Sequence, residues 1–227
     1  MFDVNAWVAD LTAKLEDTFP DKLLFVGLQG SYRRGEADCR SDIDVVVILD
    51  TLSLLDLVQY KSILSTMPQS DKSCGFISGR QELINWPKHE LFQFVHDTLP
   101  VRGQIDGLIP AFTRDDIIES AKISASGLYH ACCHAFVHER LNLETVKKFF
   151  KSAFFLLQTL YHLRHDVYID TKKALEPLLA GNEALILRIA MNWDDYKLKI
   201  TAEPDYYYDL LIKWCAGILK EPFEDLS

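Results

Sequence analysis

The sequence lacks several features that would assign it to a specialised class of protein. Among its 227 residues, no apolar run approaches the ~18 residues that a membrane-spanning helix needs. Residues 1–8 have neither the basic start nor the apolar core of a signal peptide. The five cysteines, an odd number without repeated spacing, favour free thiols in a reducing compartment over a disulfide framework. We therefore expect a cytoplasmic protein that does not enter a membrane.

An excess of positive charge is also missing. The chain has 24 Lys and Arg against 33 Asp and Glu, a formal net charge of −9 at pH 7. This balance argues against a broad surface for long nucleic acids, and it favours a small acceptor molecule, a cationic one or a protein partner. Hydrophobic residues make up 48% of the chain and its mean hydropathy is near zero. These values are typical of a packed globular protein of one large or two small domains.

Residues 30–44, with the sequence GSYRRGEADCRSDID, carry the strongest functional signal. They follow an apolar run, Leu23–Leu28, that has the length and composition of a buried strand, and they lead into a second run, Val45–Leu49. Asp42 and Asp44 are two positions apart, so they project to the same side of a strand. Two adjacent carboxylates repel each other, and an oxygen-seeking cation such as Mg2+ would stabilise them.

The motif has several positions in a fixed order between the two apolar strands. They are Gly30-Ser31, Arg34-Gly35 and Ser41-Asp42-Ile43-Asp44. Each piece alone is commonly a solvated turn, but the ordered combination is far more specific. It resembles the signature of the polymerase-β-type nucleotidyltransferases. In particular, it resembles their small bacterial branch, which includes the minimal nucleotidyltransferases and the aminoglycoside and lincosamide adenylyltransferases.

The resemblance implies a Mg2+-dependent enzyme that moves a nucleoside monophosphate, AMP from ATP, to a hydroxyl of a small molecule such as an aminoglycoside-like antibiotic. Pyrophosphate would leave, and Asp42 and Asp44 would hold the metal against the phosphates. Two alternatives are an antitoxin-type nucleotidyltransferase that modifies a protein partner, and a catalytically silent module that binds nucleotide or a partner. The implied nucleotide-binding positions are Gly30, Ser31, Arg34 and Ser41.

Family members usually add an acidic residue from a neighbouring strand, which completes the metal site and often acts as base on the acceptor hydroxyl. We predict the next strand at Glu90–Val95 and favour Glu90 as the third catalytic and metal-binding carboxylate, because it begins that strand as the family's residue does. Asp97 closes the same strand and is the alternative, facing the opposite side. Asp106 is a weaker third possibility that is more typical of a loop or a cap.

The predicted elements indicate an α+β fold, in which a nucleotidyltransferase mixed sheet flanked by helices is followed by an all-α helical bundle. We place the nucleotidyltransferase domain at residues 1–110 and the bundle at residues 111–227. In the first part, the sequence predicts helices at 4–19 and 54–67, a short strand at 74–78 and a helical turn at 81–86, with the helices on one face of the sheet. In the second, it predicts helices at 117–140, 143–165, 172–179, 183–191 and 205–220.

Two features of the helical part favour a plain structural interpretation. His130, His134 and His138 are four apart and therefore share one helix face. No HExxH or paired CxxC motif accompanies them, so we interpret them as hydrogen-bonded histidines and not as a zinc site. We likewise expect Tyr206–Tyr208 to pack a terminal helix against its neighbours and not to stack on a substrate.

Overall fold

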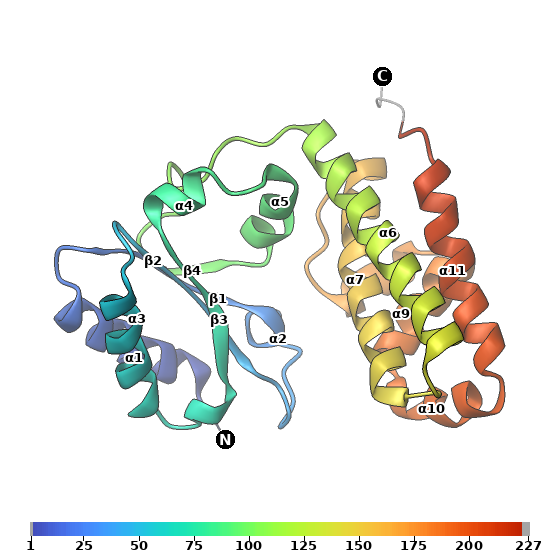
Figure 1. Ribbon diagram of the computed structural model, residues 1–227, viewed down its shortest axis with the longest axis horizontal. Coiled ribbons are helices and arrows are strands. Elements are labelled where there is room, and N and C mark those ends of the chain that lie inside the picture. The colour runs from blue at the N-terminus through green and yellow to red at the C-terminus, as the bar shows by residue number, and fades with distance from the viewer. Residues whose placement is uncertain (1, 224–227) are drawn as a thin grey trace. The chain divides into compact units, whose positions relative to one another are not determined.

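The computed structural model describes residues 2–223. The chain divides between Ala111 and Phe112 into two compact units (Figure 1); the sequence predicted a boundary between residues 110 and 111. The first unit combines a sheet with helices, whereas the described part of the second is helical. The predicted fold class, an α+β arrangement with a mixed sheet followed by helices, is confirmed.

The sheet of the first unit has four strands in the order β3-β2-β1-β4. β2 pairs antiparallel with β1 and parallel with β3, and β1 pairs antiparallel with β4, so the sheet is mixed. The two central strands coincide with the apolar runs on either side of the motif. The strands are β1 (Leu23–Gln29), β2 (Ile43–Leu49), β3 (Ser73–Gly79) and β4 (Leu99–Arg102).

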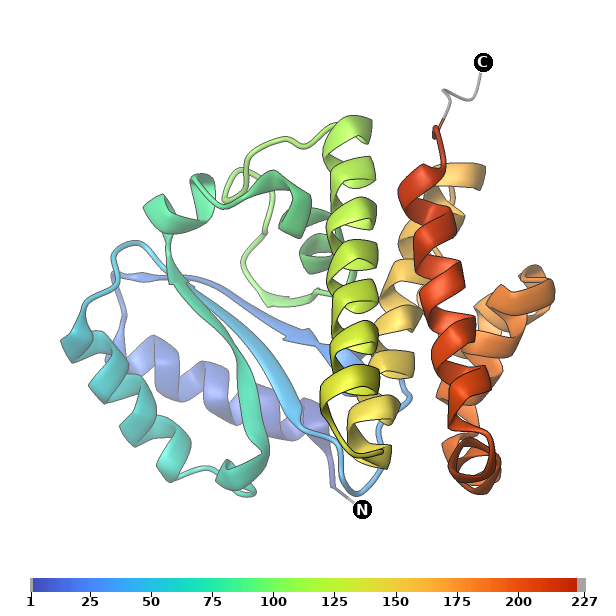
Figure 2. The same cartoon turned by 45° about the vertical axis from the view of Figure 1, so that its right-hand side comes forward.

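Helices cover both faces of this sheet, not one face as the sequence predicted. α1 (Val4–Thr18) and α3 (Leu54–Ser65) lie on one side, and α4 (Arg80–Ile84) and α5 (Lys88–His96) lie on the other (Figures 1 and 2). The physical reason is the composition of β2, in which every residue from Val45 to Leu49 is apolar and buried. Successive residues of a strand point to opposite faces, so both faces of β2 need a cover.

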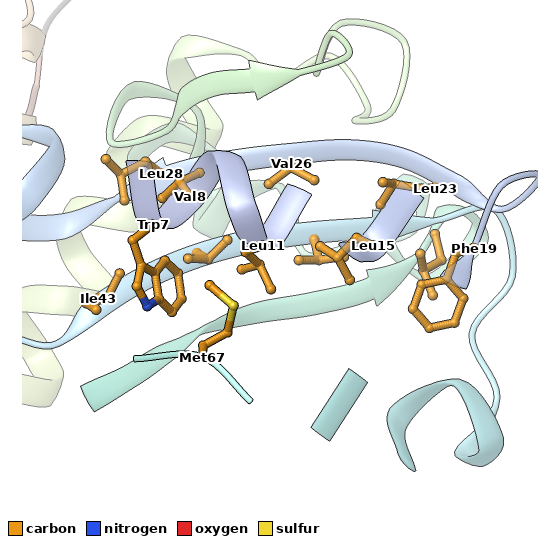
Figure 3. Close-up of a cluster of buried hydrophobic side chains, with 13 residues drawn as sticks. Trp7, Val8, Leu11, Leu15, Phe19, Leu23, Val26, Leu28, Ile43 and Met67 are labelled. Atoms are coloured by element: carbon orange, nitrogen blue, oxygen red, sulfur yellow. The ribbon is translucent and has the colours of Figure 1, made fainter. Parts of the chain in front are cut away.

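The core on the α1 side is a continuous apolar cluster. α1 places residues at helical spacing, among them Trp7, Leu11 and Leu15, against residues of the central strands such as Leu28 and Ile43 (Figure 3). All five side chains are almost fully buried. This packing fixes the two strands whose ends carry the motif.

The predicted strand at Glu90–Val95 is wrong, because these residues form part of the helix α5. Leu91 and Phe92 are buried and the neighbouring residues are partly exposed, which is a helical and not an alternating pattern of burial. An acidic residue, Glu90, stands in the first turn, where the helix dipole favours negative charge. The fourth strand is instead β4, which follows α5 after two residues.

The second unit consists of helices that pack on one another, chiefly α6 on α7 and α11, and α7 on α9. Thr113 caps α6 through a capping box with Asp116, so this helix begins at Arg114 and not at the predicted residue 117. Asn142 caps α7, which begins at the predicted residue 143. The sequence analysis missed α10. The helices are α6 (Arg114–His138), α7 (Leu143–His165), α8 (Lys172–Leu175), α9 (Gly181–Met191), α10 (Trp193–Ala202) and α11 (Pro204–Lys220).

The histidines of α6 are exposed, and of the three tyrosines that the sequence predicted to pack a terminal helix, Tyr206 is exposed and the other two are buried. His134 lies between His130 and His138 on an exposed face of α6, with ring centroids 6.1 and 5.0 Å away. Tyr207 and Tyr208 are buried on α11. Across residues 2–223, no helix has both the length and the apolar character required to cross a membrane.

Asp56 is a buried carboxylate that ties α3 to the start of the sheet. It closes a capping box with Ser53, and its Oδ1 lies 2.9 Å from Nζ of Lys22. The hydrogen bonds from Ser53 and Lys22 lower the pKa of Asp56 to about 2. The carboxylate thus loses its stabilising charge only in strong acid.

We expect the Asp56→Asn variant to have a lower melting temperature than the wild type at pH 7. The pKa of Asp56 in the folded protein lies below the ordinary value of about 3.9. Its contribution to the free energy of unfolding is therefore complete above that value and is lost as the pH falls to about 2. Thermal denaturation between pH 2 and 7 checks this, since the variant should lose less stability than the wild type over that acidic range. Asp10→Asn, which removes an exposed partner of Lys14, is the control and should change little. Equal acid sensitivity of Asp56→Asn and wild type would contradict the prediction.

Candidate active site

The site is built where β1 ends beside the first residues of β2. Gln29, the last residue of β1, pairs with Asp44 of β2. The next residue, Gly30, has a left-handed backbone (φ 70°) and begins the single turn α2 (Gly30–Arg33). A Cβ built on Gly30 would lie 2.1 Å from Oδ2 of Asp44. Only glycine allows the chain to turn this close to the carboxylate.

The two predicted metal ligands stand at the start of β2. Asp44 is partly buried and Asp42 is exposed, while Ile43 between them is fully buried. Because residues two apart share one side of a strand, both carboxylates lie on the side opposite Ile43. Asp44 is the one polar residue of β2. A polar group in an otherwise apolar central strand, against a glycine turn, indicates a function other than packing.

Arg34, which the motif predicted to bind the nucleotide, is paired with carboxylates of the protein. Its side chain is only 3% exposed, its Nη1 donates to Oδ1 of Asp97, and its Nε lies 3.3 Å from Oε2 of Glu36. The guanidinium therefore faces carboxylates of the protein itself. Asp97 is 63 residues away in the sequence, and the local motif gives no sign of this pairing.

The backbone of the turn is likewise held from within the protein. The N–H of Gly30 donates to Oδ2 of Asp97 at 3.1 Å, so it does not face a phosphate as the motif predicted. One residue away, Nε2 of Gln29 donates to Oγ1 of Thr98 at 2.6 Å. The partly exposed Ser31 is the remaining part of the predicted phosphate-binding turn.

Ser41 shapes the loop before β2. Its hydroxyl accepts a hydrogen bond from the N–H of Asp38 at 2.9 Å, and its own N–H donates to the Asp38 carbonyl at 3.1 Å. Oδ1 of Asp38 in turn accepts from the N–H of Arg40 at 2.7 Å. The side chain of Ser41 thus stabilises the tight turn that immediately precedes Asp42 and β2.

The structure does not bring Glu90 to the aspartate pair. Glu90 is exposed on α5, and its Oε2 accepts a hydrogen bond from Nε1 of Trp86 at 2.8 Å. Asp106 is exposed in the segment after β4. Within residues 2–223, no three His, Cys, Asp or Glu side chains form a group that could hold a metal ion. The predicted set of three carboxylates is therefore not assembled, and the expectation of a strand that begins at Glu90 misled its choice.

The strands on either side of Asp44 explain the missing third carboxylate. In the sheet register, Asp44 lies between Gln29 of β1 and Cys74 of β3. Cys74 is an exposed free thiol. Neither neighbouring strand thus offers a carboxylate beside Asp44. The sequence analysis did not find Cys74, because its place beside Asp44 depends on the parallel pairing of β2 with β3.

Two comparisons with known proteins find similarity. Residues 11–73 match a family model described as a nucleotidyltransferase domain, and this stretch contains β1, the Gly30 turn and the aspartate pair. Among solved structures, the chain is similar to spectinomycin adenyltransferase AAD(9) from Enterococcus faecialis, crystallised with ATP and spectinomycin. The TM-score is 0.61 at 14% sequence identity, and the match covers 96% of this chain and 100% of that chain. A comparison with curated proteins gives no match.

The fold and the family model both indicate similarity to the nucleotidyltransferases. The stretch that matches the nucleotidyltransferase domain model lies within the first unit. Over both units, its fold is like that of an aminoglycoside adenylyltransferase.

We expect Gly30→Ala to abolish nucleotide binding, whereas Gly35→Ala should retain most of it. Both glycines have left-handed backbones, with φ of 70° and 67°, so each alanine costs about 1–2 kcal/mol of backbone strain. Only at Gly30 does the new methyl group collide with Asp44, because nothing lies within 4 Å of a Cβ at Gly35. Calorimetric titration with Mg-ATP checks the pair. Equal binding by the two variants would show that the contact with Asp44 is unimportant.

Proposed function

We propose that the protein transfers AMP from ATP to a hydroxyl group of a small molecule and releases pyrophosphate. The observation that carries this proposal is the contact between Gly30 and Asp44, where a glycine turn and an acidic strand end meet inside the segment that matches the nucleotidyltransferase model. A similar fold crystallised with ATP and an antibiotic supports a nucleotide and a small acceptor as the two substrates.

The residues present fit a magnesium ion. Asp42 and Asp44 supply carboxylate oxygens, the donors that Mg2+ prefers, and they leave room in its coordination shell for phosphate oxygens. When bound, Mg2+ would neutralise charge on the triphosphate and on the departing pyrophosphate. The role of the two aspartates is to hold this positive charge beside the turn.

The chain's own groups orient the reaction. The Ser31 hydroxyl donates a hydrogen bond to a phosphate oxygen, and the left-handed backbone of Gly30 keeps the turn against Asp44. The acceptor oxygen attacks the α-phosphorus, and the bond from that phosphorus to the bridging oxygen of the β-phosphate breaks. The proton of the acceptor hydroxyl passes to water, and pyrophosphate leaves with the bonding electrons.

The acidity of the chain supports a small acceptor. With a net charge of −9, the surface repels long polyanions and attracts cationic molecules such as aminoglycosides. An antitoxin-type enzyme that modifies a protein is the alternative on the same fold. A catalytically silent nucleotide-binding module is a further alternative, and it is favoured by the positions beside Asp44, which hold Gln29 and Cys74 in place of a third carboxylate.

Incubation with labelled ATP and Mg2+, together with aminoglycosides, lincosamides or cell lysate, tests the proposal. We expect label on a small molecule, and none when the metal is removed by a chelator. Label on a protein would favour the antitoxin-type alternative, and no label in any fraction would favour the silent module.

We expect Asp42→Asn and Asp44→Asn each to lower the transfer rate by at least about a hundredfold, since each removes charge stabilisation from the reacting phosphates. Asp50→Asn is the matched control, because Asp50 is an exposed aspartate that follows the opposite end of the same strand. Its rate should equal that of the wild type. Full activity in either site variant would remove the aspartate from the mechanism.

The Glu90→Gln variant should keep a transfer rate within about twofold of the wild type, as is usual for an exposed residue outside a reacting site. The reason is its position on α5, where it is exposed and hydrogen-bonded to Trp86. Steady-state assays over pH 6–9 check this. If the variant lost its activity, Glu90 would be the catalytic base despite its position on a helix.

A further inference from the structure

Two hydrogen bonds join the turn to Asp97 at the end of α5. Asp97 is the C-terminal cap of α5, and its two oxygens have different partners. Oδ1 accepts from Nη1 of Arg34, and Oδ2 accepts from the N–H of Gly30 at 3.1 Å. Arg34 also reaches Glu36, with Nε 3.3 Å from Oε2. One carboxylate thus fixes both ends of α2.

Burial makes this link strong. The side chains of Arg34, Asp97 and Glu36 are 3%, 15% and 19% exposed, respectively. A hydrogen bond between charged groups away from water is stronger than one between neutral groups. Removing one partner takes away part of the compensation of the other buried charge, which is unfavourable.

Gly30 is consequently held from two sides. Asp97 holds its N–H, and Oδ2 of Asp44 lies where its Cβ would be. The neighbouring pair reinforces this, because Gln29 donates to Oγ1 of Thr98. Two consecutive residues after α5 therefore accept hydrogen bonds from the last residue of β1 and the first residue of the turn.

We propose that Asp97 and Arg34 form a positioning pair that fixes the Gly30 turn against Asp44 and thereby sets the nucleotide-binding geometry. This inference rests on the proposed function for its ligand, a nucleoside triphosphate. Asp97 acts through Gly30 and does not bind the metal, because its two oxygens face Arg34 and the Gly30 N–H.

Two conservative variants test the pair. Asp97→Asn keeps the shape of the side chain but loses its charge, and Arg34→Lys keeps the charge but loses the fork that reaches two carboxylates at once. We expect each to weaken Mg-ATP binding about tenfold or more, as for loss of a hydrogen bond to a charged group. The two residues act as one unit. We therefore expect the double variant to lose clearly less affinity for Mg-ATP than the product of the fold-losses of the two single variants.

The Mg2+ dependence separates positioning from metal binding. The Mg2+ concentration for half-maximal binding, measured at saturating ATP, should be unchanged in both variants. If Asp97 were a metal ligand, Asp97→Asn would raise this concentration and Arg34→Lys would not. That result would overturn the inference.

Asp56→Asn is the control for a general loss of stability. Asp56 is also a buried aspartate with a cationic partner in the first unit, but it contacts Lys22 and Ser53 and not the turn. It should lower the melting temperature while leaving the dissociation constant for Mg-ATP unchanged. An Asp97→Asn variant that binds Mg-ATP as tightly as the wild type would overturn the proposed positioning role.

Hydrogen exchange at the Gly30 amide gives a readout that needs no nucleotide. The amide should exchange faster in Asp97→Asn than in the wild type, and it should be unaffected in Asp56→Asn. If the wild type fails to bind Mg-ATP, the proposed function is wrong, and this exchange rate still decides whether the pair holds the turn. An unchanged rate in Asp97→Asn would refute the pair by itself.

Discussion

The site depends on the absence of one carbon atom. The turn after β1 can lie against the carboxylate of Asp44 only because Gly30 has no side chain, since a Cβ there would lie 2.1 Å from Oδ2. The sheet register sets this approach by pairing Gln29 with Asp44. The apolar core beneath then holds both strands in place (Figure 3). The packing of the core, the register of the sheet and the backbone of Gly30 together set the contact between the turn and Asp44.

The charges around this contact suit the metal ion of the proposed function. Asp42 and Asp44 lie at the start of β2 and Asp97 caps α5 beside the turn, whereas the buried guanidinium of Arg34 is hydrogen-bonded to Asp97 and Glu36. A triphosphate brings further negative charge to this surface. Under the proposed function, binding of a triphosphate requires added cations, and two hard carboxylates are suited to recruit Mg2+. In that proposal, the ion would supply the positive charge that the sequence assigned to Arg34.

Local patterns predicted most of the fold, and long-range pairing explains what they missed. The central strands follow from continuous apolar runs, and the long helices from caps such as Thr113 and Asn142. The Glu90–Val95 segment was misassigned because a short apolar run suits a strand or a helix equally well until its packing partners are known. The motif likewise located Asp44 but not its surroundings. The partner of Arg34 lies 63 residues away, and no local spacing encodes such a contact.

The crowding at residue 30 also restricts how this chain can diverge. Every amino-acid substitution at residue 30 adds at least one carbon, and that carbon would collide with the carboxylate of Asp44. A lineage could tolerate a larger side chain at residue 30 only after shortening the one at residue 44, which would itself remove the acid. Substitutions at residues 30 and 44 are therefore coupled. Once the aspartate is lost, selection no longer keeps the glycine, and the reverse also holds.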